Sequence, residues 1–146
     1  MAFSHIGLYV TDMESTVTFY TGVLGFSVTD RVRIRGRDVV FLSRSPEEHH
    51  QIVLVPGRAP HSPSTVNQIS FRVISLAESR RLHGTLAGLR VPCLDPTNHG
   101  GSWSVYFSDP EGTTRAPSSG GLRHPTKQLL AEAQRGFPES TRRIQR

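Results

Sequence analysis

The sequence predicts an α+β fold built from two βαβββ modules. The first observation is an internal repeat, in which the segment at 4–10 (SHIGLYV) returns at 67–73 (NQISFRV), a shift of 63 positions because 68 − 5 = 63. The second is that 24–28 (LGFSV) meets 87–91 (AGLRV) at the same shift. The third is that both copies are followed by the same order of helix and strand patterns. Two matches at one shift indicate a duplicated unit.

The first module is expected over residues 1–57. Alternating apolar residues predict a strand over 3–10, and Thr11 with Glu14 three positions later forms a capping-box pattern at the start of a helix. Gly25 is expected to end that helix. Three further strands are predicted, at 26–34, 39–42 and 49–55.

Residues 58–65 are interpreted as a linker, because they contain two prolines and no apolar period. The second module is expected over 66–121, with a second capping box at Ser75 and Glu78. Its strands are predicted at 66–73, near 89–94 and at 102–108.

The last strand of the second module should begin at Thr113, but the sequence there favours only a weak strand. Pro117 and the two glycines that follow do not suit the middle of a sheet. A frame disruption of the gene that erased the last strand is an alternative explanation of this tail. Residues 122–146 are predicted to form a C-terminal helix, at 126–135, and a polar tail.

The composition is that of a soluble globular protein, with 36% hydrophobic and 20% charged residues among 146. No apolar run approaches the ~18 residues that cross a bilayer, and the N-terminus lacks the pattern of a signal peptide. We therefore expect a cytoplasmic protein without a membrane partner.

The net charge of +5 does not predict nucleic-acid binding, because the basic residues are dispersed along the chain. Four arginines do cluster, but they alternate with other residues, which is typical of the solvated face of one strand. These arginines are Arg31, Arg33, Arg35 and Arg37.

Three motifs resemble those of the vicinal oxygen chelate superfamily, which includes glyoxalase I, the bleomycin- and fosfomycin-resistance proteins and the type I extradiol ring-cleaving dioxygenases. The motifs are HIGLYV at 5–10, FYTGVLGF at 19–26 and SVYFSDPEG at 104–112. The resemblance covers about residues 3–116. It implies that the two modules curl into an open, incomplete barrel with the site on its concave face, and that the protein forms a homodimer.

The histidine pair His49-His50 ahead of a strand looks most like the extradiol dioxygenases. That resemblance implies that His50 acts as an acid or base and that Tyr106 orients the substrate. It also implies substrate contacts for His49 and His99. The substrate would be a small aromatic, catechol-like molecule, and the cofactor would be Fe²⁺ if the site is functional.

The metal ligands depart from the family pattern. The resemblance implies two histidines and one glutamate around ferrous iron. His5 matches the first histidine, but Gln68 stands at the second position and Ala116 at the glutamate position. A site made of His5, His50 and Gln68 is a second arrangement, while Glu111 is expected to face water from a turn.

Two functions follow from these residues. The first is an extradiol dioxygenase-like enzyme with an altered or lost metal site. The second is a metal-free protein that binds a small molecule in the same cleft, as resistance proteins of the superfamily do. Metal content of the purified chain distinguishes the two.

Overall fold

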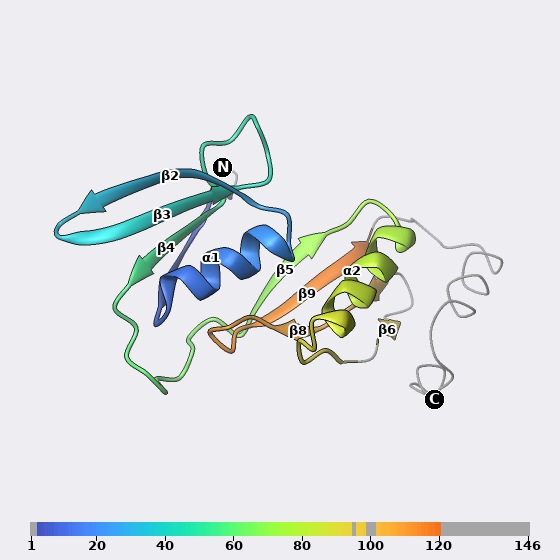
Figure 1. Ribbon diagram of the computed structural model, residues 1–146. Helices are drawn as coiled ribbons and strands as arrows, with labels where there is room; N and C mark the ends of the chain where they lie inside the picture. The colour runs from blue at the N-terminus through green and yellow to red at the C-terminus, as the bar shows by residue number, and fades with distance from the viewer. Residues whose placement is uncertain (1–2, 95, 99–101, 121–146) are drawn as a thin grey trace. The chain divides into compact units, whose positions relative to one another are not determined.

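The computed structural model describes residues 3–94, 96–98 and 102–120. The described chain forms two units, each with one helix and one sheet (Figure 1). The first unit contains residues up to Thr65 together with Asp109–Gly112, and the second contains Val66–Ser108 and the chain from Thr113. The predicted helix at 126–135 lies outside the described residues. Neither described helix is long and apolar enough to cross a membrane.

The first unit has the predicted βαβββ order. Its elements are β1 (Ile6–Val10), α1 (Met13–Gly22), β2 (Ser27–Ile34), β3 (Arg37–Ser43) and β4 (Ile52–Pro56). The sheet order is β1-β4-β3-β2, with β1 parallel to β4 and the other neighbours antiparallel. A parallel pair requires a long crossover, which α1 and the β2–β3 hairpin provide.

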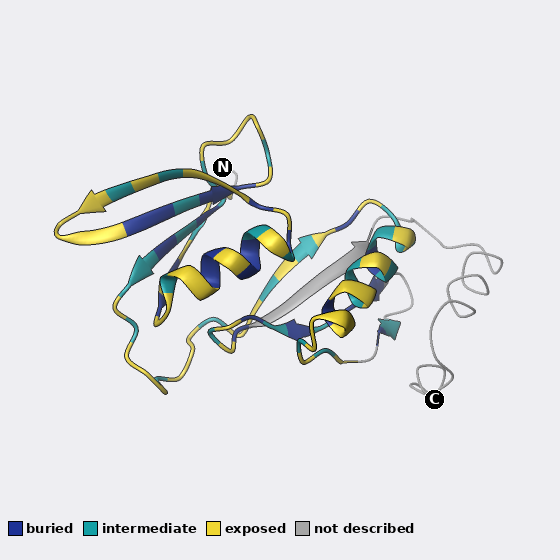
Figure 2. Ribbon diagram, viewed as in Figure 1, coloured by how far each residue is buried: buried dark blue, intermediate teal, exposed yellow. Residues whose placement is uncertain are grey.

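One face of this sheet forms the core of the first unit with α1, which contacts β2 and β4 (Figures 1 and 2). Side chains alternate between the two faces of a strand, so every second residue points toward the helix. The fully buried strand residues Val10, Val40, Leu42, Ile52 and Leu54 follow this period, and Tyr20 of α1 is fully buried as well. The other face of the sheet does not pack on α1.

The second unit repeats this topology. Its elements are β5 (Gln68–Arg72), α2 (Leu76–Gly88), β6 (Thr97–Asn98), β7 (Ser102–Ser104), β8 (Phe107–Ser108) and β9 (Thr114–Gly120). The sheet order is β5-β9-β7-β6, and β8 also pairs with β9. The helices α1 and α2 begin 63 positions apart (76 − 13 = 63), which confirms the repeat.

The last strand differs from the weak strand that the sequence predicts. Strand β9 spans seven residues and is parallel to β5 on one side. On its other side it pairs with β7 at Ser118–Gly120 and with β8 at Thr114–Arg115. Pro117 falls in the gap between these two ladders, where its missing N–H removes no pairing on that side. Residues 114–120 therefore form the last strand of the second unit, which the alternative of a frame disruption assumes to be erased.

Three local predictions need correction. The N-cap of α1 is Asp12, whose carboxylate accepts from the Ser15 amide, and not Thr11. The strand predicted near 89–94 is reduced to a single bridge between Cys93 and Phe107. The strand predicted at 102–108 is split into β7 and β8. The second predicted cap does form at Ser75, whose hydroxyl accepts from the Glu78 amide, while the Glu78 carboxylate accepts from the Ile74 amide in place of the Ser75 amide.

Candidate ligand-binding cleft

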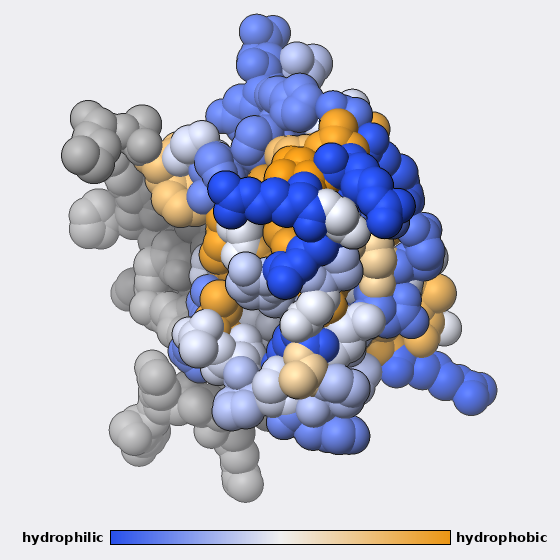
Figure 3. All heavy atoms as spheres, turned by 90° about the vertical axis from the view of Figure 1, so that its left-hand side faces the viewer, coloured by the Kyte–Doolittle hydropathy of each residue, from blue (hydrophilic) through white to orange (hydrophobic). Residues whose placement is uncertain are grey.

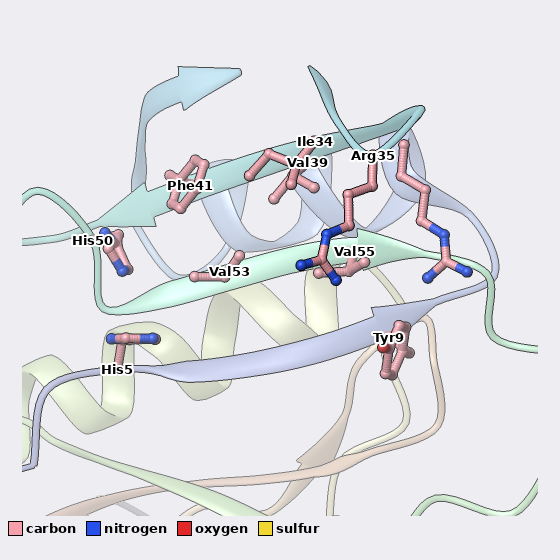
Figure 4. A pocket seen from close by; sticks show the side chains of 10 residues that line it. His5, Tyr9, Ile34, Arg35, Val39, Phe41, His50, Val53 and Val55 are labelled. Atoms are coloured by element: carbon pink, nitrogen blue, oxygen red, sulfur yellow. The ribbon is translucent and has the colours of Figure 1, made fainter. Parts of the chain in front are cut away.

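A cleft of about 560 Å³ lies on the first unit, over the face of the sheet that does not pack on α1 (Figure 4). It is lined by His5, Tyr9, Ile34, Arg35, Arg37, Val39, Phe41, His50, Val53 and Val55. This volume falls within the range of small-molecule sites, roughly 300–1,000 Å³. All ten residues belong to the first unit.

The floor of the cleft follows from the period of the strands. Val53 and Val55 alternate with the buried Ile52 and Leu54 of β4, and so they point away from the helix. Phe41 pairs with Val53 across β3 and β4, which extends the floor sideways. Hydrophobic residues therefore occupy both faces of this sheet, one face against the helix and one in the cleft.

Imidazoles form one end of the cleft. The ring centroids of His5 and His50 are 4.5 Å apart, and those of His50 and Phe41 are 4.9 Å apart. The Nδ1 atoms of His49 and His50 lie 2.9 Å apart. One of these two nitrogens must donate and the other accept, so at least one of the two rings has an unprotonated Nδ1.

The surroundings of His50 favour the neutral form of its imidazole. Burial lowers the pKa of His50 from its ordinary value, and the positive charges of His5 and His49 lower it further. A neutral imidazole can accept a proton or a hydrogen bond from a ligand. The nearest acidic contact of the cluster is that of Asp30 with His49, at 3.8 Å.

Arginines form the other end. Arg35 lies in the turn between β2 and β3, Arg37 is the first residue of β3, and Tyr9 lines the same end of the cleft as Arg35 (Figure 4). The space-filling view toward this hairpin shows hydrophobic atoms framed by strongly hydrophilic ones (Figure 3). The cleft is thus polar at both ends and apolar between them.

Gly7 leaves the middle of the floor open. It lies on β1 between His5 and Tyr9 and is paired with Val53 of β4. A Cβ atom built at Gly7 meets no atom within 4 Å, and its backbone does not require a glycine. A side chain at this position would therefore extend into the cleft without displacing the protein.

The structure places the predicted site residues in both units. His5, His49 and His50 come together in the first unit, but His49 is exposed and is not among the lining residues. Gln68 is exposed on β5 and its amide donates to Ser70 Oγ. Tyr106 is half-buried between β7 and β8. His99 lies outside the described residues.

The donor set does not fit the iron site that the sequence resemblance implies. Ala116 has no donor atom, and it pairs in register with Ser70, two positions from Gln68. His5 Nδ1 lies 3.1 Å from the hydroxyl of Ser4. Among the described residues, no group of three or more His, Cys, Asp or Glu side chains is arranged to hold a metal ion.

The sequence predicts that Glu111 faces water, but the structure buries its side chain. Its side chain is 5% exposed, and its carboxylate accepts from the amides of Thr11 and Asp12 at 2.8 and 3.1 Å. Arg58 Nη1 donates to Glu111 Oε2 at 3.2 Å and to the Glu111 carbonyl at 2.6 Å. Burial alone would raise the pKa of Glu111, but the hydrogen bonds from Asp12, Thr11 and Arg58 together lower it. Glu111 thus anchors the 109–112 turn in the first unit.

Sequence reasoning missed Tyr9, Phe41 and the arginines of the hairpin as lining residues. Period two was visible at Val39 and Phe41 and at Val53 and Val55, and it could have indicated a second apolar face of the sheet. No pattern in the sequence separates Arg35 and Arg37 from Arg31 and Arg33.

Comparison with known families gives one match that covers most of the chain. The sequence model of the Glyoxalase/Bleomycin resistance protein/Dioxygenase superfamily matches residues 2–114. No protein of curated function matches the sequence significantly.

Solved structures share the fold. A glyoxylase/bleomycin resistance protein/dioxygenase domain from Frankia sp. EAN1pec has a TM-score of 0.75 at 21% identity, over 85% of this chain and 95% of its own. A mutant of the fosfomycin resistance protein FosX from Listeria monocytogenes, complexed with Mn(II) and 1S,2S-dihydroxypropylphosphonic acid, has a TM-score of 0.67 at 20% identity, over 88% and 97%. An integron cassette protein from the mobile metagenome of Halifax Harbour Sewage Outfall has a TM-score of 0.64 at 22% identity, over 81% and 97%.

Proposed function

Since the chain belongs to the Glyoxalase/Bleomycin resistance protein/Dioxygenase superfamily, we propose that it binds a small organic molecule in the cleft of its first unit without a metal ion. The observation that carries this proposal is the cleft itself, with an apolar floor and polar groups at both ends. Ligand sites are commonly apolar pockets with a few convergent polar groups.

The site chemistry favours binding over metal-dependent catalysis. The two positions that would complete an iron site hold Gln68 and Ala116. His5 is therefore the one residue of the family's three metal ligands that this sequence keeps. His5 and His50 can instead hydrogen-bond a ligand directly. A planar aromatic molecule suits the apolar floor of Phe41, Val53 and Val55, because aromatic rings bury a large apolar area.

The test uses Gly7→Val, which fills the floor with a β-branched side chain that suits a strand. The readout is saturable binding of a fluorescent naphthalene dye and of simple aromatic compounds. We expect the variant to lose binding by at least about tenfold, which corresponds to roughly 1.4 kcal/mol. Its melting temperature should be equal or higher. Binding that is unchanged in Gly7→Val, or absent in the parent chain, contradicts the proposal.

A ring-cleaving dioxygenase is the second candidate, and the adjacency of His5 and His50 favours it. In that reaction His50 would hold or move a proton of a catechol-like substrate. The test is the appearance of ring-opened product from catechols with added Fe²⁺ under air, with His50→Gln as the control. No product from any catechol would remove this candidate and leave the binding function in place.

The FosX structure holds Mn(II) and a phosphonic acid. An anionic ligand is compatible with the arginine end of the present cleft.

A further inference from the structure

The four arginines of the β2–β3 hairpin fall into two groups. Arg31 pairs with Glu14 at 2.7 Å and Arg33 with Asp38 at 3.8 Å. The side chains of Arg35 and Arg37 make no hydrogen bond or ion pair with any other described residue, and both line the cleft. The two arginines with carboxylate partners do not line it. No residue in the part of the chain that the structure describes therefore neutralises the charge at this end of the cleft.

The turn that presents Arg35 is demanding for an arginine. Ile34 pairs directly with Arg37, so Arg35 and Gly36 form a two-residue hairpin loop. Their φ angles are +49° and +78°, as in a type I′ turn, where Asn-Gly is the favoured pair. An arginine with positive φ costs about 1–2 kcal/mol relative to ordinary backbone. This position holds a guanidinium at the cleft although a smaller residue would suit the backbone better.

The lining of the cleft, as far as the structure describes it, carries no negative charge. None of its ten lining residues is acidic, and its central floor consists of Val39, Phe41, Val53 and Val55. The extended chain from His5 to Tyr9 spans roughly 13 Å, at ~3.3 Å per residue. A ligand along the cleft would thus place one end near imidazoles and the other near two guanidiniums.

We propose that the ligand is an organic anion, whose acidic group binds Arg35 and Arg37 and whose aromatic or other flat hydrocarbon body lies on Val39, Phe41, Val53 and Val55. This proposal rests on the proposed binding function and specifies the chemical class of the ligand. Guanidinium recognises carboxylate, sulfonate and phosphonate oxygens through paired N–H donors. The neutral end of the ligand can hydrogen-bond His5 or His50.

The experiment compares two dyes with the same aromatic skeleton. Anilinonaphthalenesulfonate carries a sulfonate, and N-phenylnaphthylamine lacks it. We expect the sulfonate dye to bind the parent chain roughly tenfold more tightly, and this difference to shrink with added salt. Arg35→Gln and Arg37→Gln should each weaken the sulfonate dye roughly three- to tenfold and leave the neutral dye unchanged.

The matched control is Arg33→Gln, which removes the same charge from the same hairpin outside the cleft. It should leave the affinity for both dyes unchanged. Circular dichroism of each variant verifies the fold, so that dye bound to loosened protein is not counted. Displacement of the sulfonate dye by naphthoate and by naphthyl phosphate then ranks the acidic groups.

The outcomes separate the two proposals. Equal affinity for both dyes, with no effect of Arg35→Gln or Arg37→Gln but loss of both dyes in Gly7→Val, overturns the anion proposal and leaves the binding function standing. An Arg33→Gln effect as large as that of Arg35→Gln also overturns it, because the charge would then act non-specifically. If neither dye saturates, or Gly7→Val binds both as the parent does, the binding function itself fails.

Discussion

The hydroxyl of Thr11 donates to the carboxylate of Glu111 at 2.8 Å, although the two residues lie 100 positions apart. Their contact holds the Asp109–Gly112 turn at the start of α1, within the first unit. The Thr11 amide and the Arg58 guanidinium donate to the same carboxylate. A hydrogen-bonded ion pair at this burial is costly to break because it leaves a charged partner unsatisfied.

Glu111→Gln should therefore destabilise the first unit by about 2–4 kcal/mol. The glutamine amide has only one oxygen that can accept a hydrogen bond. Its NH₂ group cannot accept from Arg58 or Thr11, so at least one of these donors loses its partner. The measurement is urea unfolding at neutral pH. Glu47→Gln, the same change at an exposed position, is the control and should shift stability by less than about 0.5 kcal/mol. Equal effects of the two substitutions would contradict the anchoring role of Glu111.

The same carboxylate makes stability depend on acid. The folded pKa of Glu111 lies below its ordinary value of 4.5, so its contribution is full above that pH and is lost as the pH falls through the folded pKa. We expect the stability difference between the parent chain and Glu111→Gln to be constant from pH 7 to about pH 5 and to shrink below about pH 4.5. A difference that grows on acidification would show that the sign of the pKa shift is wrong.

The fold was predictable because its pattern is local and repeated. Alternation over 3–10, a capping signal at Ser75 and one shift of 63 positions suffice for two βαβββ units. The predictions that proved wrong concern residues whose contacts are distant in the sequence. Glu111 looked exposed because its partners Thr11, Asp12 and Arg58 lie 53 to 100 positions away in the sequence. Strand β9 looked weak because a proline is tolerated only where the facing ladder is interrupted, and periodicity does not show such a gap.

The site was less predictable than the fold. His5 and His50 could be predicted as site residues from their positions in the sequence. Which other residues line the cleft depends on how each side chain pairs with its neighbours in the fold. Arg31 and Arg35 have the same spacing pattern in sequence, yet the first meets Glu14 and the second meets no carboxylate among the described residues. The conformation of a two-residue turn decides this difference.

Arg35→Asn is expected to raise stability and lower anion affinity together. Asn-Gly is the preferred pair for the type I′ turn, so the unfolding free energy should rise by up to about 1 kcal/mol. Loss of the guanidinium should weaken the sulfonate dye roughly three- to tenfold. Thermal unfolding and dye titration measure the two effects on one sample. A variant that is less stable than the parent, or that binds the dye equally, would contradict this assignment.

His50 should titrate below an ordinary histidine, and burial should be the main reason. Phe41→Ala exposes the ring and should raise the pKa of His50 toward 6.5 by more than His49→Gln, which removes only a smaller charge effect. The C–H signals of the imidazoles in NMR spectra, followed across pH, give both values. A larger shift in His49→Gln would instead make charge repulsion the main cause.

Titration of His50 also affects stability and binding with defined signs. Because its folded pKa is depressed, its contribution to stability is full above pH 6.5 and is lost as the pH falls through the folded pKa. Protonation adds a positive charge to the cleft, which His5 and His49 reinforce and Asp30 partly offsets. The sulfonate dye should therefore bind more tightly at pH 5 than at pH 7.5, and His50→Gln should reduce that change.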